Sequence, residues 1–162
     1  MDTVELAYWA GFFDGEGHIE LAYTSPTYAN PRGRYAFQVW LDQWTETPDE
    51  FFAPLLDKFG GRVIPHKKNP NCYRWYISGE NGRRFLESIL PYLRKKKRVA
   101  ELGIEYQSMM QKGRGGKRTR LEETDIRARD IILREYYRLT EVTQPKRKRK
   151  LGRHTFVARK LR

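Results

Sequence analysis

The chain has 162 residues, of which 39% are hydrophobic and 14% aromatic, so it contains enough apolar material for one well-packed domain. Its 32 lysines and arginines outnumber its 20 acids and give a net charge of +12, which favours a polyanionic partner, and nucleic acid ahead of a membrane. The single cysteine, Cys72, excludes an intrachain disulfide and a cysteine-based zinc site, and without a signal peptide or a membrane-spanning apolar run we expect an intracellular protein, cytoplasmic, nucleoid-associated or organellar, with no membrane partner.

The first predicted element is an apolar helix from Thr3 to Phe13. Asp2 and Glu5 have the spacing of a capping box, and Gly15 and Gly17 favour the end of the helix, because glycine takes left-handed or strained backbone at little cost. Small residues recur along one side of this helix at three- and four-residue spacing, so another backbone could approach it closely. The chain contains no second copy of the stretch, so the partner helix would come from another molecule.

Two acids lie at the end of this helix. Asp14 and Glu16, together with the carbonyl of Gly15, put oxygen atoms within reach of a hard divalent cation such as magnesium. A helix C-terminus is the negative end of the macrodipole, which disfavours an acid unless a cation is present. The alternative is a buried helix whose terminal acids cap a neighbouring element or face water.

The rest of the chain predicts two hairpins and four further helices. The expected elements are strands at 18–24 and 35–42, a helix opened by Thr47-Pro48 and stopped by Gly60-Gly61, strands at 62–68 and 72–78, and helices at about 81–90, at 99–112 and from 119 onward. This order is typical of an α+β fold in which helices cover one face of a curved antiparallel sheet.

The other face of that sheet is basic and of mixed polarity, so it is a plausible saddle for a DNA groove. From the two hairpins, the residues expected to contact DNA are Arg32, Arg34, Gln38, Trp40, Arg62, His66, Lys68, Arg74 and Tyr76. The other basic residues expected to contact DNA are Lys95, Lys97, Arg114, Lys117, Lys146, Arg147, Lys148 and Arg149. Because the last four lie in an acid-free C-terminal stretch, we expect one domain over residues 1–142 and a basic extension over 143–162. Charge alone would suit a ribosomal protein equally well.

The stretch Trp9-Ala-Gly-Phe-Phe-Asp-Gly-Glu-Gly17 resembles the signature of the LAGLIDADG homing endonucleases, and the element order matches that family from about residue 3 to residue 110. It departs from the consensus at Trp9 and at Glu16, where the family has aspartate. The resemblance implies the family's fold with the motif helix at a dimer interface, because members with one motif act as homodimers. It also implies a site-specific, intron-encoded endonuclease that hydrolyses both strands of a long pseudo-palindromic DNA site and leaves staggered ends.

The same resemblance implies roles for individual residues. Glu16 and the Gly15 carbonyl would hold Mg²⁺, for which Mn²⁺ can substitute, Gln43 at the strand end would orient water, and Lys96 would stabilise charge at the phosphate. The alternatives are a solvated glutamine and a lysine that contacts a phosphate or water within a basic run. The residues implied at the dimer contact are Ala7, Ala10, Gly11 and Asp14.

Two other functions fit the same residues. The first is an RNA-binding intron maturase, which would prefer folded intron RNA to duplex DNA. The second is a catalytically silent DNA-binding protein or a ribosomal-type binder, whose binding would be indifferent to metal and to Glu16→Gln.

Overall fold

The computed structural model describes residues 1–24, 34–66, 69–111 and 123–143 of the chain. The elements in chain order are α1 (Thr3–Glu16), β1 (Gly17–Thr24), β2 (Arg34–Trp44), α2 (Pro48–Phe59), β3 (Arg62–Pro65), β4 (Cys72–Ser78), α3 (Gly79–Ile89), the short 3₁₀ turn η1 (Leu90–Tyr92), α4 (Lys97–Gln111) and α5 (Glu123–Thr143). The predicted α+β class and the two hairpins are confirmed. The part of the predicted last helix at 119–122 lies outside the described residues.

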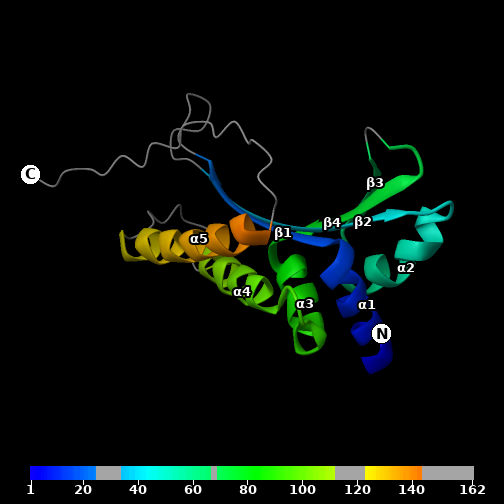
Figure 1. The fold of residues 1–162 in the computed structure, drawn as a ribbon, viewed down its shortest axis with the longest axis horizontal. Helices are drawn as coiled ribbons and strands as arrows, with labels where there is room; N and C mark the ends of the chain where they lie inside the picture. Colours follow the sequence, from blue (N-terminus) through cyan, green and yellow to red (C-terminus); the bar gives the residue numbers. More distant parts are fainter. Residues whose placement is uncertain (25–33, 67–68, 112–122, 144–162) are drawn as a thin grey trace, which may run out of the picture.

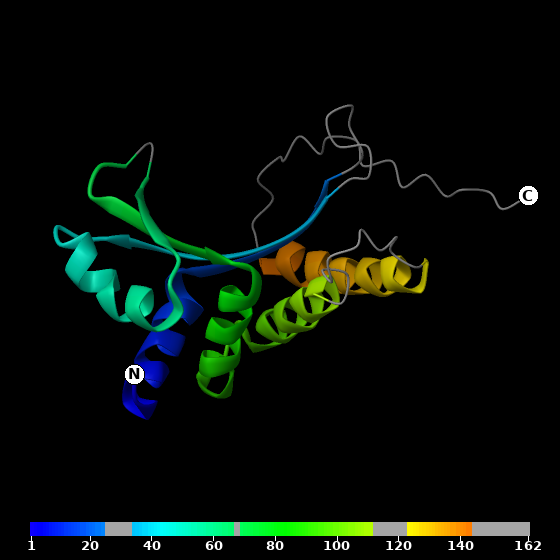
Figure 2. The same cartoon turned by 180° about the vertical axis from the view of Figure 1, so that it is seen from behind.

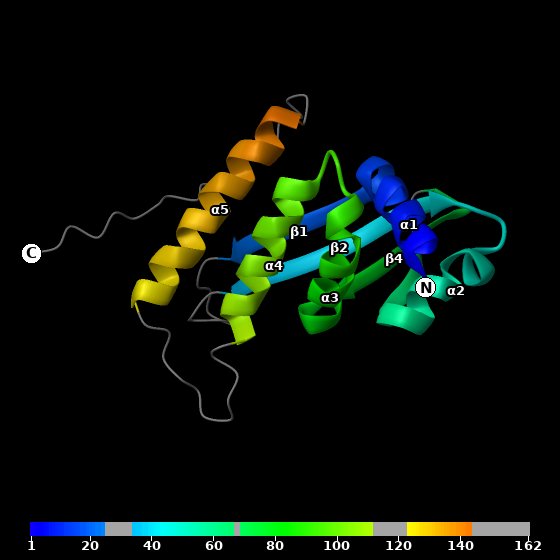
Figure 3. The same ribbon diagram turned by 90° about the horizontal axis from the view of Figure 1, so that it is seen from below.

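The strands form one antiparallel sheet in the order β1-β2-β4-β3. Figure 1 shows the sheet bent into a trough, with the described helices on its convex side and none of them in the trough. Seen from behind in Figure 2, the same arrangement holds, and Figure 3, a view from below, shows the helices side by side in front of the strands. The fold therefore leaves one long concave sheet face uncovered by any described helix.

Alternation along the strands decides which side chains enter the core. Phe37, Val39 and Leu41 of β2 are buried toward the helices, so the residues between them face the trough. The aromatic centre of the core is Phe85 of α3, whose ring makes edge-to-face contacts with Phe13, Phe59 and Trp75 at centroid distances of 5.4, 5.2 and 4.9 Å. This cluster ties α1 to α2, α3 and β4.

None of the described helices is long and apolar enough to cross a membrane.

Helix α1 begins as predicted and ends later than predicted. Asp2 and Glu5 form the capping box, with the Glu5 N–H donating to Asp2 Oδ1 at 2.9 Å and the Asp2 N–H donating to Glu5 Oε2 at 3.2 Å. The helix runs through Gly15 to Glu16, and β1 follows at once from Gly17, so the expected end at Phe13 is wrong. Glu16 is thus the last residue of the helix, at the negative end of its dipole.

Gly17 is required for space and not for a left-handed backbone. Its φ of −73° and ψ of 152° are ordinary extended values that any residue adopts. A Cβ atom built on Gly17 would lie 2.1 Å from Cδ2 of Phe13, a fully buried ring that packs on Phe85. Because Gly17 has no Cβ, β1 can begin in direct contact with the Phe13 ring, which anchors the end of α1 in the core.

This difference predicts opposite effects at two neighbouring glycines. Gly17→Ala forces Phe13 out of its place, and we expect a loss of about 1–3 kcal/mol in the free energy of unfolding. Gly15→Ala meets nothing within 4 Å in its own chain and lies in a helix, so we expect a gain of about 0.5–1 kcal/mol in the stability of the monomer. Urea unfolding of the two variants measures both values, and equal stability of the two would contradict this account of Gly17.

Candidate functional site

The end of α1 is capped by a lysine that comes from a distant part of the chain. The Lys96 ammonium donates to the carbonyl oxygens of Phe13 at 2.9 Å, Asp14 at 2.6 Å and Gly15 at 3.2 Å. The Asp14 and Gly15 carbonyls are orphan acceptors of the last helical turn, where partial negative charge gathers, whereas the Phe13 carbonyl also accepts the Gly17 N–H. The helix end therefore already binds one cation, supplied by the segment just before α4.

Asp14 holds that segment in place from the other side. Its carboxylate accepts backbone N–H groups from Arg94 at 2.7 Å, Lys95 at 3.1 Å and Lys96 at 2.8 Å. Burial alone would raise the pKa of Asp14, but these hydrogen bonds and the charge of Lys96 outweigh it and hold the pKa below its ordinary value. The Asp14 carboxylate is thus engaged within its own chain, which the expected role at a dimer contact did not anticipate.

The lowered pKa of Asp14 has a consequence for acid stability. The folded-state pKa lies below the unfolded one, so the ionised carboxylate stabilises the fold above about pH 4 and this contribution is lost as the pH falls through the folded-state pKa. Asp14→Asn removes that titration. We expect urea unfolding between about pH 5 and pH 2 to show a smaller loss of stability in the variant than in the wild type, and parallel curves would contradict the assignment.

Lys96 is half-buried in this arrangement. Burial and the neighbouring Lys95 lower its pKa, while the carboxylates of Asp14 and Glu16 act in the opposite direction. Glu16 itself is exposed, one residue beyond the carbonyl of Gly15. A cation and an exposed carboxylate therefore stand together at the end of one helix.

The third residue expected in catalysis lies at the same end of the sheet. Gly17 pairs with Leu41, and Gln43 is two residues further along β2, half-buried, where it pairs with Tyr73. The strand pairing thus brings Gln43 toward the point where α1 enters the sheet. The catalytic roles of Glu16, Gln43 and Lys96 stay predictions.

The fit of a metal ion can be judged from the donor atoms at this end of α1. Among the described residues, no three of histidine, cysteine, aspartate and glutamate gather closely enough to hold a metal. The oxygen donors that one chain supplies here are the Glu16 carboxylate and the Gly15 carbonyl. That carbonyl also accepts a hydrogen bond from the Lys96 ammonium, the longest of the three that the ammonium donates. Oxygen donors of this kind suit Mg²⁺, which keeps several waters and is commonly bound by one or two carboxylates with substrate phosphates. The residues fit a magnesium site that a second chain or a phosphate would complete.

The concave sheet face carries an ordered cluster of rings and charges. Trp40 stacks on His18 with ring centroids 4.2 Å apart, and the Arg74 guanidinium lies 4.9 Å from the Trp40 ring. Asp42 holds Arg74 by two hydrogen bonds, from Nε at 2.6 Å and from Nη2 at 2.7 Å, and this contact is the main cause of the raised pKa of Arg74. His18 and Asp42 were not among the expected DNA contacts, although alternation along their strands would have placed both beside Trp40.

The other expected DNA contacts fall into three groups. Arg34 and Arg62 are exposed and Gln38, His66 and Tyr76 are half-buried on the strands or directly after β3, with Arg62 lying 4.9 Å over the Tyr76 ring. Lys95 and Lys97 are exposed beside the end of α1 instead of on the sheet. Arg32, Lys68, Arg114, Lys117, Lys146, Arg147, Lys148 and Arg149 lie outside the described residues.

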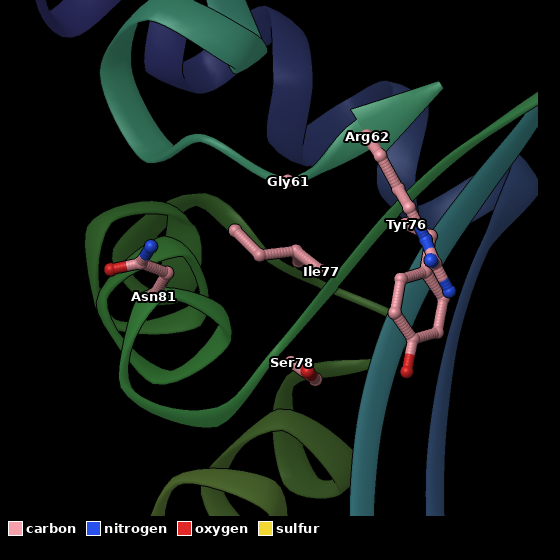
Figure 4. A pocket seen from close by; sticks show the side chains of 6 residues that line it. All are labelled: Gly61, Arg62, Tyr76, Ile77, Ser78 and Asn81. Atoms are coloured by element: carbon pink, nitrogen blue, oxygen red, sulfur yellow. The ribbon is translucent and has the colours of Figure 1, made fainter. Parts of the chain in front are cut away.

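A hollow of about 270 Å³ lies where the outer hairpin meets the start of α3. Figure 4 shows Arg62 and Tyr76 on the strand side of this hollow and Asn81 on the helix side. Its lining lacks Glu16, Gln43 and Lys96, so it is separate from the end of α1.

One face of α1 is exposed and rich in small residues. Val4 and Tyr8 are 77% and 56% exposed, and a Cβ built on Gly11 or Gly15 meets nothing within 4 Å. Ala7 lies exposed on the same face. Ala10 is fully buried in the chain's own core, so its expected place at the dimer contact is wrong. The prediction from sequence failed there because a stripe of small residues does not reveal which of them α3, η1 and the sheet cover.

Comparison with known proteins gives a consistent result. Residues 3–90 match the sequence model of the LAGLIDADG-like domain, and no curated protein matches the sequence. The homing endonuclease I-CvuI in complex with its target is 19% identical, with a TM-score of 0.66 over 90% of this chain and 86% of that one. An archaeal intron-encoded homing endonuclease complexed with DNA is 18% identical, with a TM-score of 0.67 over 91% and 88%. At these identities the likeness establishes the fold.

Proposed function

Because the chain belongs to the LAGLIDADG-like family, we propose that it is a site-specific, divalent-metal-dependent DNA endonuclease that acts as a homodimer. The observation that carries this proposal is the end of α1, where the exposed Glu16 carboxylate stands beside the Lys96 ammonium and the carbonyls that it contacts. Support comes also from the two DNA-bound homing endonucleases that share the fold. The substrate proposed is a long, pseudo-palindromic duplex from an intron-homing site.

The dimer would be formed by the exposed face of α1. Gly11 and Gly15 leave open space there, so a second copy of the helix can approach closely, with Tyr8 and Val4 supplying apolar area. A two-fold axis along this contact puts the two Glu16 residues near each other and gives each copy one half of the DNA site. The concave sheet faces of the two copies would then follow the groove, with the Trp40 and Arg74 cluster among the groups that contact bases.

Hydrolysis would use the residues at the end of α1 in distinct ways. Glu16 and the Gly15 carbonyl would hold Mg²⁺ or Mn²⁺, which supplies Lewis-acid stabilisation of the phosphoryl oxygens and an activated water when bound. The Gln43 amide would orient the attacking water by hydrogen bonding. If the Gly15 carbonyl also binds the metal ion, the Lys96 ammonium still keeps its two shorter contacts, to the carbonyls of Phe13 and Asp14. The ammonium would then offer positive charge to the phosphate. With one such site in each copy, each strand is cut once and the ends are staggered.

The basic residues beyond the sheet would add affinity without sequence preference. In this proposal residues 1–142 form the endonuclease domain, and residues 143–162, with Lys146 to Arg149, are a basic extension along the phosphate backbone. Such contacts predict an affinity that falls steeply as salt rises.

A selection experiment tests this function against the two alternatives. The protein is mixed with a randomised pool of long duplexes and an excess of structured RNA, and the retained duplexes are then incubated with Mg²⁺ or with a chelator. We expect one family of pseudo-palindromic duplexes, cut only with Mg²⁺. Preference for the RNA would favour the maturase, and specific retention without cutting in Mg²⁺ or Mn²⁺ would favour the silent DNA-binding protein.

A further inference from the structure

We propose that Asp14 is a positioning residue, whose carboxylate fixes the backbone of residues 94–96 and so sets the Lys96 ammonium at the end of α1. The role rests on the proposed function, in which Lys96 acts on the phosphate. Asp14 acts through Lys96 and is not itself a metal ligand.

The geometry is a reciprocal clamp between two helices. Asp14, in the last turn of α1, accepts three consecutive backbone N–H groups of the segment that enters α4. The Ala100 N–H donates to the Lys96 carbonyl at 2.9 Å, so Lys96 opens the first turn of α4. An acid therefore stands at the positive end of α4, and the Lys96 ammonium stands at the negative end of α1, each supplied by the other element.

The hydrogen bonds leave Asp14 little capacity to bind a metal. Oδ2 accepts from Arg94 and Lys95, and Oδ1 accepts from Lys96, so three of the roughly four acceptor positions of the carboxylate are filled. Binding a cation through these oxygens would break the clamp. Glu16, two residues further on, is exposed and is the acid that remains for the ion.

Fixing the lysine matters because its side chain is long and flexible. Immobilising a free lysine side chain costs rotamer entropy. Here the backbone is held by Asp14, and the ammonium is held by the carbonyls of α1, so this ordering is complete before DNA binds. Without Asp14 the segment before α4 loses its anchor, and the ammonium is placed less well.

A double-mutant cycle tests the coupling. Single-turnover cleavage of bound DNA is measured for Asp14→Ala, Lys96→Met and the double variant, with DNA affinity measured in parallel. We expect Asp14→Ala to slow cleavage by about 10-fold or more with affinity changed less than about 3-fold, and the double variant to be no slower than Lys96→Met alone. Losses that multiply, or wild-type cleavage by Asp14→Ala, would overturn the proposal.

Two further variants separate positioning from a general structural role. Asp14→Asn keeps one carbonyl acceptor, so we expect a cleavage rate between those of the wild type and Asp14→Ala, and this variant also serves if Asp14→Ala fails to fold. Asp57→Ala, which removes an exposed acid of α2, is the matched control and should cleave at the wild-type rate. A rate for Asp14→Asn no better than for Asp14→Ala would count against the proposal.

Amide hydrogen exchange tests the clamp without any cleavage. We expect the N–H groups of Arg94, Lys95 and Lys96 to be protected in the wild type and in Lys96→Met, and to exchange at least about 10-fold faster in Asp14→Ala. Unchanged exchange would overturn the clamp. If the wild type cuts no DNA, the proposed endonuclease function is wrong, and so is the role of Asp14 in cleavage. The exchange rates still decide separately whether Asp14 anchors residues 94–96.

Discussion

Replacing Glu16 with glutamine is expected to abolish DNA cleavage while leaving the fold and DNA binding intact. Glu16 is the one exposed carboxylate at the end of α1, since Asp14 is already used by three N–H groups. A neutral amide binds Mg²⁺ more weakly than a carboxylate and does not offset its charge, so we expect the single-turnover rate to fall by at least about 10³-fold. Affinity for the same duplex should stay within about 3-fold of the wild type, because the sheet face is unchanged.

The stability of this variant distinguishes loss of chemistry from loss of structure. Glu16 lies at the negative end of the α1 dipole, where removing a negative charge changes the free energy of unfolding by at most about 1 kcal/mol. Glu46→Gln, an exposed acid between β2 and α2, is the matched control and should cleave normally. Wild-type cleavage by Glu16→Gln would remove the central residue of the proposed mechanism.

The second large effect is expected at Gly11, on the exposed face of α1. Gly11→Leu meets nothing within 4 Å in its own chain, and leucine is the better helix former by about 0.5–1 kcal/mol, so we expect the monomer to become slightly more stable. In the proposed dimer the added side chain separates two helices that need close backbone approach, and we expect dissociation at micromolar concentrations together with loss of double-strand cleavage.

Sedimentation measures this prediction directly. The wild type is expected to sediment as a dimer and Gly11→Leu as a folded monomer, whose thermal stability lacks the contribution of dimerisation. Lys58→Leu, which adds the same side chain to the exposed surface of α2, controls for a general effect of surface leucine. A Gly11→Leu protein that is still dimeric would place the dimer contact elsewhere.

Local patterns in the sequence predicted much of the fold. The capping box at Asp2, the alternation in both hairpins and the element order all depend on interactions between near neighbours, so they could be derived without tertiary structure. The same alternation identified the uncovered sheet face with Trp40 and Arg74. Helix ends were less certain, because Gly15 continues α1 and packing of Phe13 decides what Gly17 does.

Contacts between distant segments could not be predicted. The bonds from residues 94–96 to Asp14 join positions about 80 residues apart, and no local pattern indicates them. The burial of Ala10 likewise depends on which side of α1 the rest of the chain covers. The family resemblance brought Glu16 and Lys96 together as candidates, but only the structure shows the ammonium on the carbonyls that precede Glu16.

Homodimeric, metal-dependent and site-specific cleavage is tested most directly by mapping both cut strands, at nucleotide resolution, on the duplex that the protein selects. The protein is incubated with that duplex and Mg²⁺, and the ends are sequenced strand by strand. We expect one cut in each strand, staggered symmetrically about the centre of the pseudo-palindrome, and absent with a chelator or with Glu16→Gln. Cuts in one strand only, cuts scattered along the duplex, or equal cutting by Glu16→Gln would contradict a homodimeric, metal-dependent, site-specific endonuclease.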